Sequence, residues 1–277
     1  MAVDKVARHY SDQWDLLGSF RTVNLAAREQ SLLDAVPFDK TFFSGKAVLV
    51  AGCAYGWEAL IFHRLGSRVT GVDLFTEAAV EFLDQAGAAP SHSGIQILRQ
   101  DLEQLDLPAD SFDYIHCDGI LHHTPQTELV LSRLVRVLKP GGHLVLGLYG
   151  SGGYLWAMVH AGRFAAQILS LVGVRQKQLA SLLSRIPMFR GVWSRRFEGE
   201  TVERIVWTTE NLYVPILKHF TPAQVEGMLA AEDLTNFLRR DTFQGRFVSP
   251  SEYTRLGIFT RMKYGTFYLR YAAQKRA

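Results

Sequence analysis

The sequence predicts an α/β fold in which a mostly parallel sheet carries helices on both faces. Two observations support this class. Short apolar runs that suit buried strands alternate with segments of helical periodicity between residues 48 and 149. The first of these units joins a strand, a glycine-containing turn, a helix and a second strand that ends in an acid. Such alternation is typical of parallel sheets with crossover helices.

The turn after the first strand carries the strongest functional signal. Gly52 and Gly56 lack a Cβ, so the backbone can bend sharply and come close to a ligand. The helix predicted over residues 57–65 points free N–H groups toward that ligand. Asp73 follows the second strand about 20 residues past the first glycine, where a carboxylate can accept from both ribose hydroxyls. The segment therefore predicts a site for a nucleotide-type cofactor.

The glycine spacing distinguishes between cofactors. A dinucleotide turn has the form G-x-G-x-x-G, and Trp57 occupies the third glycine position. The spacing instead resembles the first motif of the class I S-adenosylmethionine (SAM) methyltransferases, an acid followed by three alternating glycines. Gly52 and Gly56 match this motif. Val50 stands where the family usually has the acid, and Ala54 replaces the middle glycine.

Later segments continue the resemblance through residue 150. Asp101 and Leu102 follow a third strand, 95–98, where the family places an acid on the adenine amino group and an apolar residue against the ring. Residues 134–148 resemble the "RVLKPGG" segment of small-molecule methyltransferases related to ubiquinone-biosynthesis enzymes (type 11). The resemblance implies a Rossmann-like, seven-stranded, mostly parallel sheet with a helical insert after strand five. It also implies SAM as cofactor and S-adenosylhomocysteine as product.

The expected cofactor-binding residues lie after the first four strands: Gly52, Cys53, Ala54, Gly56, Asp73, Leu74, Asp101, Leu102 and Asp118. Two readings of Asp118 stay open, a cap for the turn after strand four or a replacement for the acid missing at Val50. Methyl transfer requires an aligned nucleophile and can require proton removal. His122 and His123 suit proton removal because histidine titrates near neutral pH, and Tyr149 is the third catalytic candidate. Ordinary core packing is the alternative role for the two histidines.

Four regions are expected along the chain. Residues 1–44 form an N-terminal helical cap, 45–150 the SAM-binding core, 151–215 a helical insert or lid over the acceptor, and 216–277 the C-terminal part that completes the sheet. In this last part, Thr221, Pro222 and Gln224 give a helix start with a capping box. A helix is predicted to about residue 231. Strands are predicted over 234–241 and 264–273, the last one antiparallel.

The insert is apolar and rich in arginine. His160, Arg163 and Gln167 interrupt its apolar segment, 154–174. The longest uncharged stretch is too short to span a bilayer, which needs about 20 apolar residues, so the segment indicates a buried or interfacial helix. Its apolar residues form either a lid over a hydrophobic acceptor or packing against the sheet. Its arginines form either a solvated face or a clamp for an anionic acceptor. The expected acceptor-binding residues are Tyr10, Trp156, Arg196 and Tyr213.

Composition limits the classes of partner, metal or disulfide site and cellular location that are expected. The formal net charge of +3 is too small to demand a nucleic-acid or membrane partner. Cys53 and Cys117 fall in predicted core segments, so two buried thiols are expected, with no disulfide and no metal site. No apolar run near the start suggests a signal peptide, and a cytoplasmic protein is expected. A small-molecule acceptor is the expected partner, and a homodimer stays open.

The predicted function is SAM-dependent transfer of a methyl group to O, N or C of a small or lipid-like metabolite, with specialised metabolism as one setting. Three alternatives stay open. One is methylation of tRNA or rRNA. The second is a SAM-binding protein without catalysis, which Val50 suggests. The third is a dehydrogenase, which Trp57 argues against.

Overall fold

The computed structural model describes residues 6, 9–10, 24–90, 94–151, 153–174, 176, 178–179, 181, 185, 211–240, 247–249 and 268–277. The chain divides into two compact units. The core unit comprises residues 25–153 and 218–277, and the insert unit comprises residues 1–24 and 154–217. Arg196 of the predicted acceptor site lies outside the described residues, as does most of the predicted N-terminal cap before residue 24.

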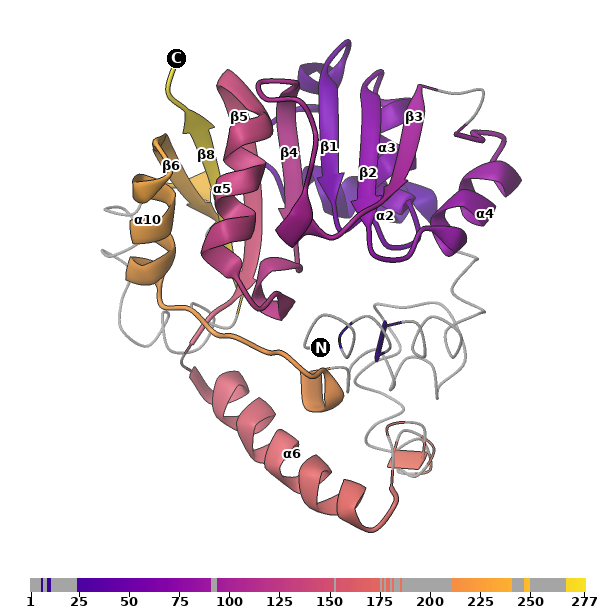
Figure 1. Ribbon diagram of the computed structural model, residues 1–277, viewed down its shortest axis with the longest axis vertical. Coiled ribbons are helices and arrows are strands. Elements are labelled where there is room, and N and C mark those ends of the chain that lie inside the picture. Colours follow the sequence, from indigo (N-terminus) through magenta and orange to yellow (C-terminus); the bar gives the residue numbers. More distant parts are fainter. Residues whose placement is uncertain are drawn as a thin grey trace. The chain divides into compact units, whose positions relative to one another are not determined.

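The core unit is built on one sheet with the strand order β3-β2-β1-β4-β5-β8-β6-β7 (Figure 1). The strands are β1 Ala47–Ala51, β2 Arg68–Asp73, β3 Ile95–Arg99, β4 Phe112–Asp118, β5 Leu138–Tyr149, β6 Leu234–Arg240, β7 Phe247–Val248 and β8 Tyr268–Lys275. Strands β1 to β5 pair in parallel, and β8 is antiparallel to both β5 and β6. The expected mostly parallel sheet is confirmed, and β7 adds a two-residue strand at its edge.

Helices cover both faces of this sheet (Figure 1). The helical elements of the core unit are α2 Leu25–Leu33, η2 Lys40–Phe43, α3 Trp57–Arg64, α4 Glu77–Gln85, η3 Leu102–Gln104, η4 Leu121–His123, α5 Thr127–Val137 and α10 Pro222–Ala231. On one face, Leu134 of α5 and Leu229 of α10 join the buried strand residues Leu49, Ile115 and Leu144 in a large apolar cluster. The alternating pattern of β1 and β4 thus buries one set of side chains under α5 and α10.

The other face is packed by aromatic side chains beneath α2 and α3. Phe43 of η2 and Phe62 of α3 both pack against Tyr114 of β4, with ring centroids 5.2 and 5.5 Å apart. All three side chains are fully buried. With both faces covered, the polar groups of the parallel strands are left accessible only at the strand ends, where ligand sites form in this architecture.

The apolar residues at helical spacing predict a helix over 126–138, a sharp stop at 139–142 and a strand from residue 143. Helix α5, Thr127–Val137, confirms the helix, but the stop is wrong, because residues 138–142 belong to β5. Leu138 has the extended values φ −77° and ψ 133° and pairs with Phe112 of β4. A register shift between Phe112 and Tyr114 accommodates the extra residues of β5, as in a β-bulge.

The capping box at Thr221 is confirmed. Its hydroxyl accepts from the Gln224 N–H, and the Gln224 side chain accepts from the Thr221 N–H at 2.8 Å. The sixth strand is confirmed as β6. The last strand begins at Tyr268 in the described residues, and the predicted start, 264–267, lies outside them.

The insert unit contains helix α6, Gly153–Leu171, as predicted from the apolar segment 154–174. The buried alternative for this helix is wrong, because Ala166 is the one described α6 residue that is buried. Among the described residues, none of the helices is long and apolar enough to cross a membrane.

Candidate active site at the carboxyl ends of the strands

The turn after β1 adopts a left-handed backbone at three alternating positions. Gly52, Ala54 and Gly56 have φ values of 76°, 45° and 79°. A non-glycine residue pays about 1–2 kcal/mol for this conformation, so Ala54 stores strain where the family has glycine. A Cβ on Gly52 would lie 2.3 Å from Cδ1 of Ile120 in the loop after β4. The turn therefore needs glycine at its first position.

Asp73, at the end of β2, fixes this turn. Its Oδ2 accepts from the Ala54 N–H at 2.8 Å, and its Oδ1 accepts from the Phe75 N–H at 3.2 Å. Burial raises the pKa of Asp73. Cys53 beside it is fully buried, and burial together with the Asp73 charge raises the pKa of its thiol, so this cysteine is chemically inert. The structure thus places the predicted ribose-binding acid against the predicted turn.

The Asp101 carboxylate has a clear local role. It accepts from the Glu103 N–H at 2.9 Å and caps the short helix η3. Leu102 is buried in the large apolar cluster. These contacts leave the adenine contacts expected from the family as predictions.

The acid missing at Val50 leaves an apolar position inside the sheet. Val50 is 2% exposed and lies between Gly71 of β2 and His116 of β4. Glu58, in the first turn of α3, accepts from Arg28 at 2.6 Å, and although burial alone would raise the pKa of Glu58, the Arg28 guanidinium holds it below its ordinary value. The sequence reading missed this carboxylate, although a Glu in the first turn of a helix that follows a glycine turn is visible in the sequence.

Asp118 is held by β8. It forms an ion pair with Arg270 and accepts from the Tyr268 hydroxyl at 2.7 Å. Burial alone would raise the pKa of Asp118, but the Arg270 guanidinium holds it below its ordinary value. Gly147 of β5 makes room for this network, because a Cβ there would lie 1.6 Å from Asp118 Oδ1. Neither reading of Asp118 anticipated this pair.

A cluster of histidine and tyrosine rings lies beyond the ends of β4 and β5. The His122 ring centroid lies 4.1 Å from that of His123 and 4.0 Å from that of Tyr149. Tyr149 in turn lies 6.2 Å from His219 and 5.6 Å from Tyr268. The three predicted catalytic residues are therefore together, and His219 and Tyr268 join them from distant parts of the chain.

Main-chain hydrogen bonds hold His219 in this cluster. The Lys218 N–H donates to the His122 carbonyl at 2.9 Å, and the Phe220 N–H donates to the Tyr149 carbonyl at 3.0 Å. The only sequence signal for this residue was its position just before the Thr221 capping box. Nothing in the spacing linked it to His122.

The protonation of His122 follows from its contacts. The Tyr149 N–H donates to His122 Nδ1 at 3.4 Å, so Nε2 carries the proton of the neutral ring. Burial, with smaller effects from His123 and His219, lowers the pKa of His122 well below its ordinary value. Nε2 is buried and has no acceptor among the described residues. His122 is thus a buried, neutral hydrogen-bond donor whose Nε2–H has no acceptor among the described residues.

The remaining predicted residues belong to the insert unit. Trp156 is half-buried, with its ring centroid 4.5 Å from that of His160. Burial raises the pKa of Tyr213, whose hydroxyl has no partner among the described residues. The Tyr10 ring packs edge-on to His9. Within the described part of the chain, no three His, Cys, Asp or Glu side chains are grouped to hold a metal ion.

These residues fit a nucleoside cofactor such as SAM. The left-handed turn lets the main chain approach a ligand, and Asp73 supplies a carboxylate beside it. Helix α3 begins at Trp57 without a side-chain cap, so its first N–H groups stay available. The turn 52–56 and Asp73 would hold the cofactor.

Comparison with known proteins supports the same assignment. Residues 49–146 match the family described as "Methyltransferase domain". The chain is 30% identical over 185 residues to the ubiquinone biosynthesis O-methyltransferase of Pseudomonas syringae pv. tomato, covering 66% of this chain and 75% of that protein. It is 31% identical over 149 residues to the corresponding enzyme of Actinobacillus pleuropneumoniae, covering 51% of this chain and 61% of that protein.

Solved structures share the fold. The 1,6-didemethyltoxoflavin-N1-methyltransferase of Burkholderia thailandensis, with bound S-adenosylhomocysteine, has a TM-score of 0.53 at 18% identity, covering 98% of this chain and 87% of that chain. The YcgJ protein of Bacillus subtilis has a TM-score of 0.53 at 15% identity, covering 91% and 99%. Together with the relatives and the turn geometry, this shows that the chain belongs to the class I SAM-dependent methyltransferases.

Proposed function

We propose that this methyltransferase transfers the methyl group of SAM to an oxygen atom of a small, lipid-like metabolite. The observation that carries the proposal is the buried donor at His122 Nε2, which lies in the ring cluster beyond β4 and β5 and lacks an acceptor among the described residues. A hydroxyl or phenolic oxygen would satisfy it. The relatives named above, which are O-methyltransferases of ubiquinone biosynthesis, support oxygen as the methylated atom.

The chain's own residues would divide the work as follows. When bound, SAM supplies an electrophilic methyl group on a sulfonium. The turn 52–56 and Asp73 would bind and orient it. His122 would donate from Nε2 to the acceptor oxygen and stabilise its negative charge as the proton leaves, since a buried donor is strongest against developing charge. His123, next to it, is the proposed proton acceptor.

Aromatic residues complete the proposed acceptor site. Tyr149 lies beside His122 and Tyr268 packs edge-on to Tyr149, and aromatic walls suit a flat or apolar acceptor. The comparisons do not favour RNA as the acceptor or a binding protein without catalysis. We also propose that the enzyme acts in the cytoplasm without a nucleic-acid partner; a homodimer stays a prediction.

Label transfer from methyl-tritiated SAM tests the proposal. Purified protein and host extract are incubated together and separated into organic-soluble, water-soluble small-molecule, RNA and protein fractions. We expect label in the organic-soluble fraction, in a product whose label is lost on ether or ester cleavage. Label in RNA would overturn the acceptor class, and label on nitrogen or carbon would overturn the oxygen assignment. No label with SAM binding intact would contradict catalysis on any acceptor in that extract.

A further inference from the structure

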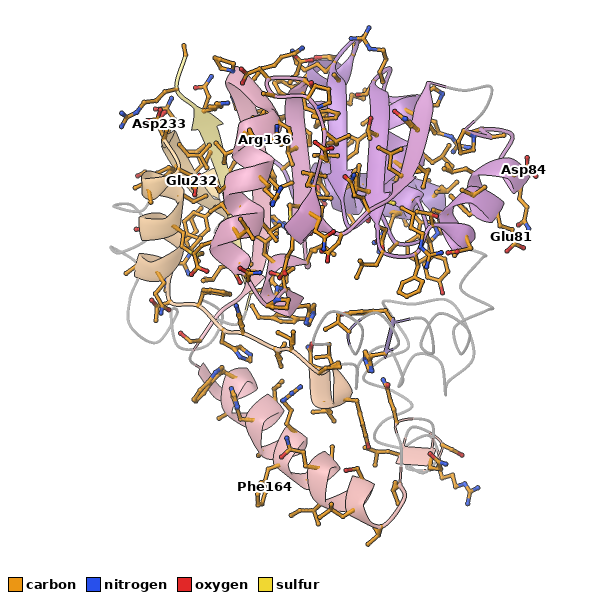
Figure 2. The ribbon with its side chains drawn as sticks, in the orientation of Figure 1. Glu81, Asp84, Arg136, Phe164, Glu232 and Asp233 are labelled. Carbon is orange, nitrogen blue, oxygen red and sulfur yellow. The ribbon has the colours of Figure 1, made fainter. Side chains whose placement is uncertain are left out.

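Helix α6 exposes an apolar face along its C-terminal half. Phe164 and Ile168 are 67% and 51% exposed, and Leu171 and the following Val172 are 85% and 75% exposed. Their spacing of three to four residues puts them on one side of the helix. Figure 2 shows the Phe164 side chain projecting from α6. A contiguous exposed apolar face of this kind usually marks an interaction surface.

The opposite side of α6 is already packed within the insert unit. Arg163 donates to the carbonyl oxygens of Asn211 at 2.6 Å and Val214 at 3.1 Å. Ala166 is 2% exposed and Val214 is fully buried. The helix therefore has its internal packing side, and the exposed apolar face is a second side that the described residues of the unit do not cover.

The sequence around this face carries charge of a single sign. Residues 151–197 contain seven Lys and Arg and no Asp or Glu. Because the whole chain has a formal net charge of +3, the other 230 residues together carry −4. The apolar face thus lies in a strongly basic segment of an otherwise acidic protein. A basic segment with an apolar helical face is typical of helices that lie on membrane surfaces.

We propose that α6 docks flat on a membrane surface rich in anionic phospholipid. The apolar face formed by Phe164, Ile168, Leu171 and Val172 would insert at the level of the headgroups. The basic residues of 151–197 other than Arg163, which is engaged within the insert unit, would attract the segment to the anionic lipids. Docking in the plane agrees with the lack of any described helix able to cross a membrane.

Charge argues for lipid over a second copy of the chain. Two copies meeting through this face would bring two segments of +7 together, and like charges oppose that association. An anionic lipid surface satisfies both the apolar face and the charge. This inference does not depend on the identity of the methyl acceptor.

Vesicle flotation with the full-length protein tests the inference. Vesicles of phosphatidylcholine alone are compared with vesicles in which about a third of the lipid is phosphatidylglycerol. We expect flotation with the anionic vesicles, weak flotation with the neutral ones, and loss of binding at high salt, because salt screens the lipid charge. The double variant Phe164→Glu and Ile168→Glu should bind anionic vesicles about tenfold more weakly or worse.

A matched control separates this face from a general effect of added acid. Val80→Glu replaces an apolar residue that is 42% exposed on α4 of the core unit, and it should float like wild type. SAM binding by calorimetry verifies that each variant is folded. Wild type that stays at the bottom with both vesicles, or a double variant that floats as well as wild type, would overturn the inference. So would a dimer in light scattering that the double variant dissociates without lipid.

Discussion

The two halves of the active edge are built in different ways. Beyond β1 and β2, the turn 52–56 is shaped by backbone conformation and by one carboxylate, Asp73, from the adjacent strand. Beyond β4 and β5, the site is built from side chains that come from distant segments, including Asp118 with Arg270 and His122 with His219. The proposed cofactor half, which comprises the turn 52–56 and Asp73, is local and can be recognised in the sequence. The proposed acceptor half, which comprises the ring cluster around His122 and the Asp118–Arg270 pair, is assembled only by the sheet.

The largest expected effect is at His122, in the acceptor half. His122→Phe removes the buried Nε2–H donor, and label transfer should fall about 100-fold or more. SAM affinity by calorimetry should change less than about twofold, because the cofactor half is untouched. His122→Asn, which keeps a donor, should retain more activity than His122→Phe.

A control for this experiment is His143, which lies on β5 six residues before Tyr149 and outside the ring cluster. His143 is half-buried opposite Tyr114 of β4, and His143→Gln should leave label transfer near wild type. If His122→Phe transferred label at the wild-type rate, the proposed division between the two halves would be lost.

The second effect concerns the ion pair under the acceptor half. Asp118→Ala leaves the Arg270 charge without its partner, and the free energy of unfolding should fall by about 2–3 kcal/mol, less than for a fully buried pair. The two side chains are 22% and 17% exposed, which sets this discount. Denaturant unfolding measures the loss. Combining Asp118→Ala with Arg270→Met should cost less than the sum of the single changes.

SAM binding by the Asp118→Ala variant tests whether Asp118 belongs to the acceptor half or to the cofactor half. The structure engages its carboxylate with Arg270 and Tyr268, whereas the sequence reading gave it a cofactor role. If Asp118→Ala weakened SAM binding as strongly as loss of Asp73, this residue would belong to the cofactor half as well. If the losses in the free energy of unfolding from Asp118→Ala and Arg270→Met simply added in the double variant, the energetic coupling of this ion pair would be contradicted.

Asp73 is the corresponding test of the cofactor half. Asp73→Ala removes a charged acceptor and releases the Ala54 N–H, and SAM should bind about tenfold more weakly or worse. Titration calorimetry measures the affinity. The matched control is Asp101→Ala, which removes another carboxylate that accepts from a main-chain N–H, here at the start of η3. This change should weaken SAM binding less than Asp73→Ala. Equal losses of SAM affinity in the two variants would contradict a specific role of Asp73 in cofactor binding.

The pH dependence of stability reports on the acceptor half. His122 is neutral in both the folded and unfolded chain above about pH 6.5. As the pH falls below this value, the unfolded chain takes up a proton that the folded chain resists, because burial lowers the pKa of His122. Stability should therefore decline with falling pH, with a slope of up to about 1.4 kcal/mol per pH unit for this group.

The variant His122→Gln should show a shallower decline in denaturant unfolding between about pH 7.5 and pH 5.5. His116 and His143, whose pKa values burial also lowers, account for part of the remaining slope. An unchanged slope in His122→Gln would place the protonation elsewhere.

The smallest effect is a gain in stability at the turn. Ala54→Gly relieves the left-handed strain at φ 45°, partly offset by the greater freedom of glycine in the unfolded chain, for a net gain of about 0.5–1 kcal/mol. Ala86→Gly, where φ is −80°, should instead lose stability. If Ala54→Gly also lowered the free energy of unfolding, the proposed backbone strain at Ala54 would be contradicted.

Local signals predicted much of the fold. The capping box at Thr221, the helix after Gly56 and the acid at Asp73 depend on neighbouring residues, so their geometry follows from short spacings. The start of β5 was misplaced because the glycine pair 141–142 suggests a stop, while pairing with β4 makes residues 138–142 part of the strand. Backbone pairing across the sheet overrode the local preference.

By itself, then, the sequence determined the class of fold and the turn after β1, and it predicted catalytic roles for His122, His123 and Tyr149. Only the tertiary structure decided what surrounds them. Tyr268 reaches Asp118 across 150 residues of chain, and no spacing rule can pair side chains that far apart. Strand β8 inserts between β5 and β6, and that insertion, a property of the whole sheet, pairs Arg270 with Gly147 and places the guanidinium of Arg270 against Asp118.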